Sequence, residues 1–93
     1  MISPLVELFL AQANRRPDQE AVVLGGQIMT YRGLEDRMLA CSGYLRDRGV
    51  GAGDRVLLFV PPGPELYALI LATWRVGAVA VFVDAWTSRH RLG

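Results

Sequence analysis

The stretch RVLLFVPPGPELYALILATWRVGAVAVFV, residues 55–83, decides the fold because it places two apolar runs on either side of a helix-forming segment. Residues 55–60 and 78–83 show no alternation of polar and apolar positions, which is typical of strands buried on both faces of a parallel sheet. Prolines and a glycine at 61–64 end the first run, and residues 65–76 are rich in strong helix formers. The stretch therefore predicts a βαβ unit with parallel strands and a right-handed crossover.

The sequence before this unit predicts one helix and a short hairpin. Ser3-Pro4 has the residue types of an N-cap followed by the first helical position, and the helix is expected to end by Arg15-Arg16. Residues 21–24 and 27–30 are expected to form strands. The dipeptide Gly25-Gly26 between them is typical of a two-residue hairpin turn.

A second helix is predicted from Thr30, as its cap, to about Arg48. Gly49 follows at the position where a left-handed residue commonly ends a helix. One apolar stripe at helical spacing marks the face that should be buried; it consists of Leu34, Met38, Cys41 and Leu45. We expect this helix, and the first one, to cover the two parallel strands. The predicted fold class is α/β.

Composition excludes several classes of function. The 93 residues allow one domain, and one cysteine with one histidine provides neither a disulfide framework nor a zinc site. All ten basic residues are arginines, so mechanisms that need a lysine, such as a Walker loop or a Schiff base, are excluded for residues 1–93. A net charge of +1 provides no basic surface for nucleic acid.

A membrane span over residues 66–83 is the least favoured alternative. The stretch is long and apolar, but Arg75 lies near its centre and Gly77 interrupts it. The N-terminus lacks the basic region of a secretory signal, and Glu7 interrupts its apolar run. A helix followed by a buried strand explains the same residues, so we expect no membrane partner.

Two loops are candidate anion sites. The glycine-rich loop 49–53 precedes a strand, whereas phosphate loops follow a strand and open a helix. The loop 61–64 does stand between a strand and a helix, but its three prolines remove three amide donors. We therefore interpret both loops as structural connections.

The remaining candidates for catalysis or ligand binding are isolated side chains. Asp84 follows the second apolar run, where open α/β sheets often bind ligands, and Trp86 is close enough in sequence to line such a pocket. A turn or capping role is commoner for such an aspartate. Cys41 is interpreted as a core residue and His90 as an exposed imidazole near the C-terminus. No catalytic, cofactor-binding or metal-binding residue is assigned.

The order of short motifs carries more information than any one of them. They run over about residues 4–92 and read Arg16-Pro17-Asp18, Ala21-Val22-Val23, Thr30-Tyr31 with Leu34, Gly49-Val50, Gly53-Asp54-Arg55-Val56, and Gly77-Ala78. In this order and spacing the chain resembles the start of the adenylate-forming superfamily, which includes acyl-CoA synthetases, peptide-synthetase adenylation domains and luciferases. Residues 1–93 are thus identified as an N-terminal fragment of an AMP-binding domain, with no complete second domain.

The resemblance implies an ATP- and Mg-dependent ligase that activates a carboxylate as an acyl-adenylate. Most members then pass the acyl group to a thiol of coenzyme A or of a carrier-protein phosphopantetheine. The family's lysine-containing and ribose-binding motifs lie further along and have no counterpart in residues 1–93. The resemblance therefore leaves open whether this chain is itself an enzyme, and alone it is expected to be inactive, with no cofactor of its own. The implied location is cytoplasmic.

An alternative is a stand-alone interaction or regulatory module derived from the same fold. The expected partner is either the remainder of the same enzyme or a second copy that associates through exposed apolar strands. Two doubly apolar strands with few covering elements motivate this expectation, because an uncovered apolar face favours association.

Overall fold

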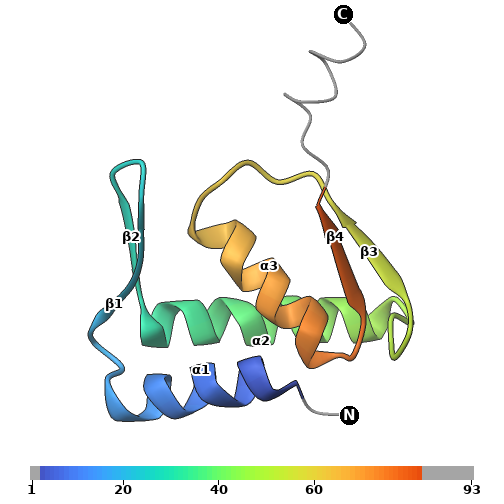
Figure 1. Ribbon diagram of the computed structural model, residues 1–93, viewed down its shortest axis with the longest axis horizontal. Coiled ribbons are helices and arrows are strands. Elements are labelled where there is room, and N and C mark those ends of the chain that lie inside the picture. The colour runs from blue at the N-terminus through green and yellow to red at the C-terminus, as the bar shows by residue number, and fades with distance from the viewer. Residues whose placement is uncertain (1–2, 83–93) are drawn as a thin grey trace, which may run out of the picture.

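The computed structural model describes residues 3–82, and this part of the chain forms a helical layer flanked by two small sheets (Figure 1). One sheet is an antiparallel hairpin and the other is a parallel pair. The elements, in order, are α1 Pro4–Arg15, β1 Glu20–Leu24, β2 Gln27–Thr30, α2 Tyr31–Asp47, β3 Arg55–Leu58, α3 Pro64–Arg75 and β4 Val79–Phe82. The α/β class and every predicted element are confirmed.

The predicted helix boundaries follow from their capping residues. The hydroxyl of Thr30 accepts a hydrogen bond from the Gly33 amide at 3.1 Å, which satisfies one free donor at the start of α2. Gly49 follows α2 with φ 82°, so the left-handed end is confirmed. At α1, Ser3 is extended and Pro4 is the first helical residue, but the Ser3 side chain makes no capping hydrogen bond.

The hairpin is closed by two glycines that both have positive φ. Gly25 at 55° and Gly26 at 81° match a type I′ turn, whose twist suits a two-residue connection. Leu24 pairs with Gln27 across this turn. The register then shifts between Glu20 and Val22, where β1 has one residue more than its partner.

The βαβ unit is present with parallel β3 and β4, as predicted. Leu58 pairs with Phe82, and β3 spans Arg55–Leu58, two residues short of the predicted end at Val60. Val83, the predicted end of β4, lies outside the described residues. At the start of the two strands, the Val79 amide donates a hydrogen bond to the Asp54 carbonyl at 2.7 Å.

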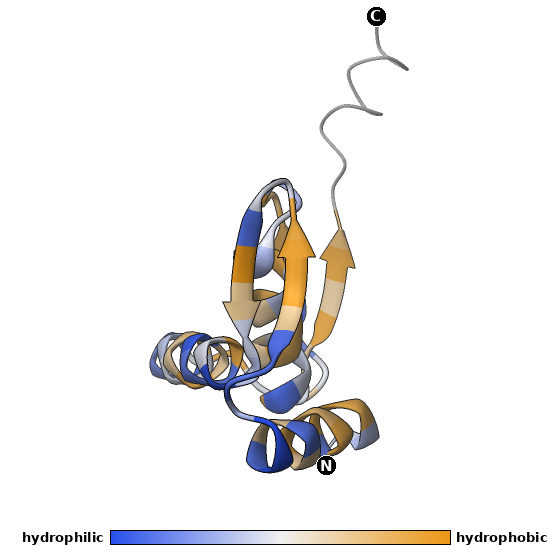
Figure 2. Cartoon of the chain, turned by 90° about the vertical axis from the view of Figure 1, so that its left-hand side faces the viewer, coloured by the Kyte–Doolittle hydropathy of each residue, from blue (hydrophilic) through white to orange (hydrophobic). Residues whose placement is uncertain are grey.

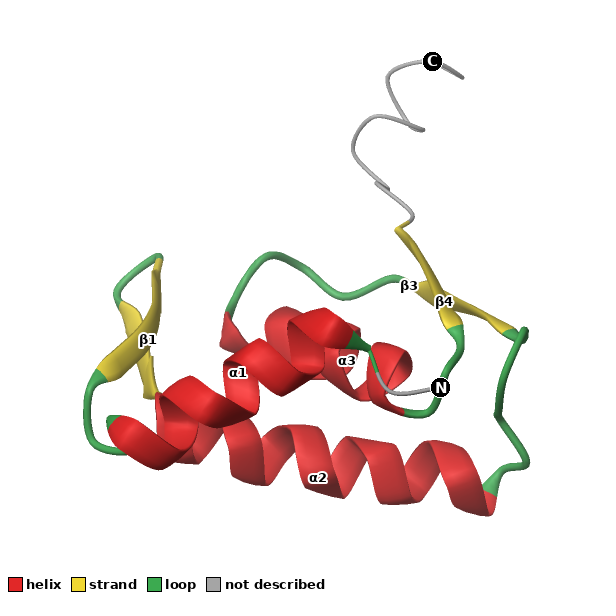
Figure 3. Cartoon of the chain, turned by 60° about the horizontal axis from the view of Figure 1, so that its bottom comes forward, coloured by secondary structure: helices red, strands yellow, loops and turns green. Residues whose placement is uncertain are grey.

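The core lies between the helices. α2 packs along α3, and α1 packs against both helices (Figures 1 and 3). Its central cluster is made of Val6, Met38, Leu45 and Ala72. Three of the four predicted stripe residues of α2 are buried, and the fourth, Cys41, packs against the cluster while remaining half-buried.

The expected cover of the parallel strands is wrong in one respect. α2 contacts neither β3 nor β4 among the described residues, because it packs on the side of α3 away from them; only α3 contacts the pair. One face of β3–β4 is therefore open, with Leu57 58% and Val79 51% exposed, and Phe59, just after β3, is 66% exposed. The prediction that the first run is buried on both faces does not hold within these residues.

The membrane alternative is not supported. The apolar stretch divides into α3, which ends at Arg75, and β4, with a turn at Gly77 between them. Within residues 3–82, helices fall short of the length and apolar character needed to cross a bilayer.

Replacing Met38 by alanine is expected to lower the free energy of unfolding by about 2–5 kcal/mol, because Met38 is fully buried and the cavity left behind cannot close completely. Chemical denaturation measures the difference. Leu39→Ala is the matched control, because Leu39 is 41% exposed and should cost much less. Equal losses for the two variants would show that α2 does not present this face to the core.

Candidate functional site

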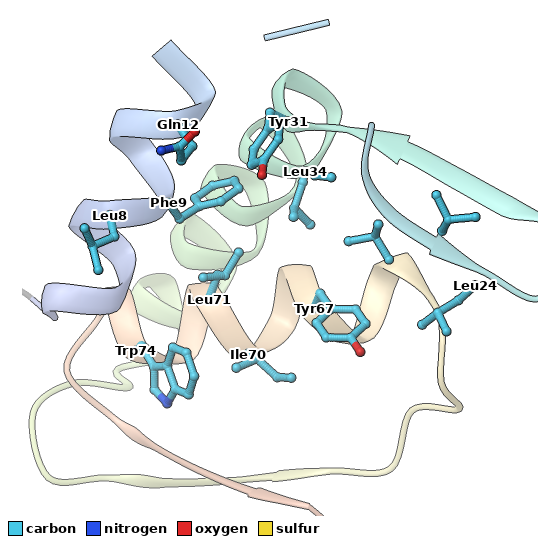
Figure 4. Close-up of a pocket in the computed structure, with 13 residues that line it drawn as sticks. Leu8, Phe9, Gln12, Leu24, Tyr31, Leu34, Tyr67, Ile70, Leu71 and Trp74 are labelled. Carbon is cyan, nitrogen blue, oxygen red and sulfur yellow. The ribbon is translucent and has the colours of Figure 1, made fainter. Parts of the chain in front are cut away.

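A groove of about 650 Å³ is lined by residues of α1, β1, α2 and α3 (Figure 4). α1 contributes Leu8, Phe9 and Gln12, and α3 contributes its face at Tyr67, Ile70, Leu71 and Trp74. Residues 21–24 of β1 form one wall, and the first turn of α2 closes the end with Tyr31 and Leu34. We call this hollow the β1 groove.

The walls of the β1 groove are almost entirely apolar. No charged side chain is among its lining residues, and the polar groups are Gln12, the indole of Trp74 and two tyrosine hydroxyls. The rings of Phe9 and Tyr31 pack with their centroids 6.0 Å apart, which fixes the junction of α1 and α2. The groove therefore favours apolar groups and offers no counter-charge for a phosphate.

Arg37 and Glu65 form a two-point ion pair that the sequence did not reveal. Arg37 Nη2 donates to Glu65 Oε2 at 3.0 Å, and Arg37 Nε lies 3.0 Å from Oε1. This hydrogen bond and the adjacent negative charge raise the pKa of Arg37. The pair joins α2 to the first turn of α3, and a separation of 28 residues leaves no local pattern by which to find it.

Cys41 lies one turn after Arg37 and is the one free cysteine of the chain. Burial raises the pKa of its thiol, and the Arg37 charge opposes this shift only partly. A raised pKa lowers the thiolate fraction near neutral pH, so the residue is a poor nucleophile. This agrees with its interpretation as a core residue.

The glycine-rich loop uses two of its amides for internal hydrogen bonds, and the proline loop is closely packed at Gly63. In the glycine-rich loop, the Gly51 amide donates to Asp54 Oδ2 at 2.8 Å, and the Gly53 amide donates to the Gly77 carbonyl at 3.2 Å. In the proline loop, Gly63 precedes α3, and a Cβ there would lie 3.1 Å from Gln27 Oε1. The two amides of the glycine-rich loop are therefore not free to bind an anion in this conformation.

The remaining candidates fall outside the described residues, namely Asp84, Trp86 and His90. Within residues 3–82, no group of three His, Cys, Asp or Glu side chains is placed to hold a metal ion.

Comparison with known proteins identifies the class of fold. The family model described as "AMP-binding enzyme" matches residues 9–93. Bacitracin synthase 3 of Bacillus licheniformis is 34% identical over 89 residues, which cover 96% of this chain and 1% of the synthase. A long-chain-fatty-acid–CoA ligase of Salmonella typhimurium is 40% identical over 81 residues, covering 86% of this chain and 14% of the ligase.

A solved structure gives the same result for the backbone. The N-terminal subdomain of NpsA from Klebsiella oxytoca, solved in complex with 3-hydroxyanthranilyl-AMSN, superposes with a TM-score of 0.85 at 28% identity. The match covers 100% of this chain and 24% of that subdomain. The chain therefore spans only a small part of each protein that it matches.

Alkylation by iodoacetamide near pH 8 is expected to be slower at Cys41 in the folded chain than in the denatured chain, because its raised pKa leaves less thiolate. Mass spectrometry over time gives both rates. Arg37→Gln should slow the folded chain further, because it removes the positive charge that opposes the shift. Faster labelling of the folded chain would contradict the assignment.

Proposed function

Since the chain belongs to the AMP-binding enzyme family of adenylate-forming ligases, we propose that it is the N-terminal part of an ATP-dependent enzyme that activates a carboxylic acid as its acyl-adenylate. The observation that carries the proposal is the family match over residues 9–93, which extends across all the described helices and strands after the first turn of α1. The NpsA superposition supports it independently, through the backbone.

Three features of the described residues support the proposal that Mg-ATP is bound by other parts of such an enzyme. The β1 groove has no charged lining residue, and the amides of Gly51 and Gly53 already donate to oxygens of the chain itself. Arg37 is occupied by Glu65, and the nearest partner of Arg32 is Asp18 at 3.9 Å. We therefore propose that this segment is scaffold and is inactive when alone.

The proposal extends to the fate of the acyl group. Transfer to a thiol of coenzyme A or of a phosphopantetheine carrier is supported by the kinds of relative found, which include a CoA ligase and a peptide synthase. A cytoplasmic location belongs to the same proposal, because ATP and coenzyme A are both abundant there.

A chimera tests the proposal. The segment of the Salmonella ligase that matches this chain is replaced by the corresponding residues of this chain, and ATP–pyrophosphate exchange with a long-chain fatty acid is measured. We expect exchange from the chimera and none from residues 1–93 alone. The unaltered ligase is the positive control, and a Met38→Ala chimera tests whether activity depends on the correctly packed segment.

Two results would contradict this assignment. Exchange by the isolated chain above an empty-vector preparation would show that it carries catalytic groups. A chimera that is folded and binds ATP but lacks exchange, with the unaltered ligase active, would show that this segment cannot serve as the start of such an enzyme.

We also propose that the open face of β3–β4 contacts further ligase polypeptide, and in the isolated chain we expect copies to associate through it. Leu57 of β3 and Phe59 just after it are more than half exposed, and burying such side chains is favourable. Sedimentation velocity should show a concentration-dependent shift that Leu57→Ser with Phe59→Ser reduces. Leu5→Ser with Leu8→Ser on α1 is the matched control, because these residues are similarly exposed. A monomer at all concentrations would overturn this expectation.

A further inference from the structure

We propose that the β1 groove is a docking site for an extended strand of the ligase polypeptide that lies outside residues 1–93, and that this strand pairs with the free edge of β1. That the strand comes from the ligase polypeptide rests on the proposed function. How it docks is argued from the unpaired edge of β1, the residues on the floor of the groove and the lack of charged lining residues.

The groove runs along the edge of β1 that β2 does not use. Its wall is formed by four consecutive residues, 21–24, and none of β2. Successive side chains of a strand point to opposite faces, so a hollow that contacts four in a row follows the strand edge and not one face. Among the described strands β1 pairs only with β2, which leaves this edge unpaired (Figure 2).

The hairpin register identifies the backbone groups that face the groove. Leu24 and Gln27 flank the two-residue turn, so they form a hydrogen-bonded pair. The next pair, Val23 and Ile28, is then the non-hydrogen-bonded kind, in which both residues direct N–H and C=O away from each other. Val23 therefore presents a donor and an acceptor to the groove edge, and Ile28 presents the same groups to the opposite edge.

The floor of the groove fits the side chains of such a strand. Tyr67, Ile70 and Trp74 follow one another at helical spacing along α3, so they form one apolar strip beneath the edge (Figure 4). A strand paired with Val23 would direct alternate side chains onto this strip. Because no charged residue lines the groove, those alternate positions should be apolar and uncharged.

An extended polypeptide meets these features better than other occupants. A strand edge offers backbone groups in series, which another strand satisfies and a helix or an aliphatic chain does not. The match to NpsA covers 24% of that subdomain, so a protein of this kind contains most of its subdomain outside the present segment. A strand from that polypeptide is held at high effective concentration and needs little intrinsic affinity.

The test uses the 93-residue chain and overlapping peptides of about 12 residues, long enough for one strand. The peptides cover the Salmonella ligase outside its matched segment. Amide exchange is followed by ¹⁵N NMR. At a peptide concentration about ten times Kd, the Val23 amide should exchange roughly tenfold more slowly, because exchange occurs only in the unbound fraction. The Leu24 amide, already bonded to β2, is an internal reference.

Two proline variants form a matched pair. Val23→Pro removes the donor that faces the groove, whereas Ile28→Pro removes the equivalent donor on the opposite edge; proline is tolerated on a strand edge. Their parent residues are equally exposed, at 57% and 59%. We expect Val23→Pro to weaken peptide binding at least tenfold and Ile28→Pro to leave it unchanged. Tyr67→Asp, which places a charge on the floor, should weaken binding without loss of the hairpin.

The remaining outcomes overturn the proposal. Binding that protects β3 but not Val23 would assign the strand to the other sheet. Protection of Val23 that rises with chain concentration in the absence of peptide would assign the groove to a second copy. If decanoate shifts the NMR signals of Tyr67 while no peptide slows exchange of the Val23 amide, the groove is a small-molecule site instead. If the chimera is active but no peptide slows exchange of the Val23 amide, only the docking site is rejected. If the chimera is inactive but a peptide does slow that exchange, only the proposed function is rejected.

Discussion

The contact between α2 and α3 is the interaction on which the rest of the fold depends. Met38 is fully buried and shares a cluster with Ala72 of α3, and the fully buried positions of α3 include the small residues Ala68 and Ala72. The two buried hydroxyls nearby bond to their own helices, from Ser42 to the Met38 carbonyl and from Thr73 to the Leu69 carbonyl, each at 2.7 Å. Both helices can therefore approach closely without leaving polar groups unsatisfied.

This contact determines where the strands lie. α3 uses one side for α2 and another for β3 and β4, so α2 is not free to cover the sheet. The hairpin is held separately, by main-chain bonds from Tyr31 to Gln19 and from Arg32 to Pro17, which tie the segment before β1 to the start of α2. The two small sheets thus lie on either side of α3, and the β1 groove lies between the hairpin, α1 and α3.

The sequence predicted what depends on neighbouring residues and missed what depends on distant ones. Thr30, Gly25-Gly26 and Gly49 act within a few residues, so their caps and turns were predictable. The apolar run at β3 correctly indicated a strand, but its burial depends on elements beyond those described here, and Leu57 is 58% exposed. The Arg37–Glu65 pair and the β1 groove each join elements far apart in the chain, and periodicity carries no information about such pairs.

The uncovered strands also bear on what the segment is for. Proteins that fold alone usually protect strand edges with charges, prolines or bulges. Here the Val23–Ile28 pair places two exposed apolar side chains on adjacent strands, and Leu57 of β3 and Phe59 just after it are also exposed. The described strands do carry a bulge between Glu20 and Val22 and a charge at Arg55, but these features leave the apolar side chains exposed. A surface of this kind suits a segment whose sheets are completed by further polypeptide, and it argues against a stand-alone module as the reason for this sequence.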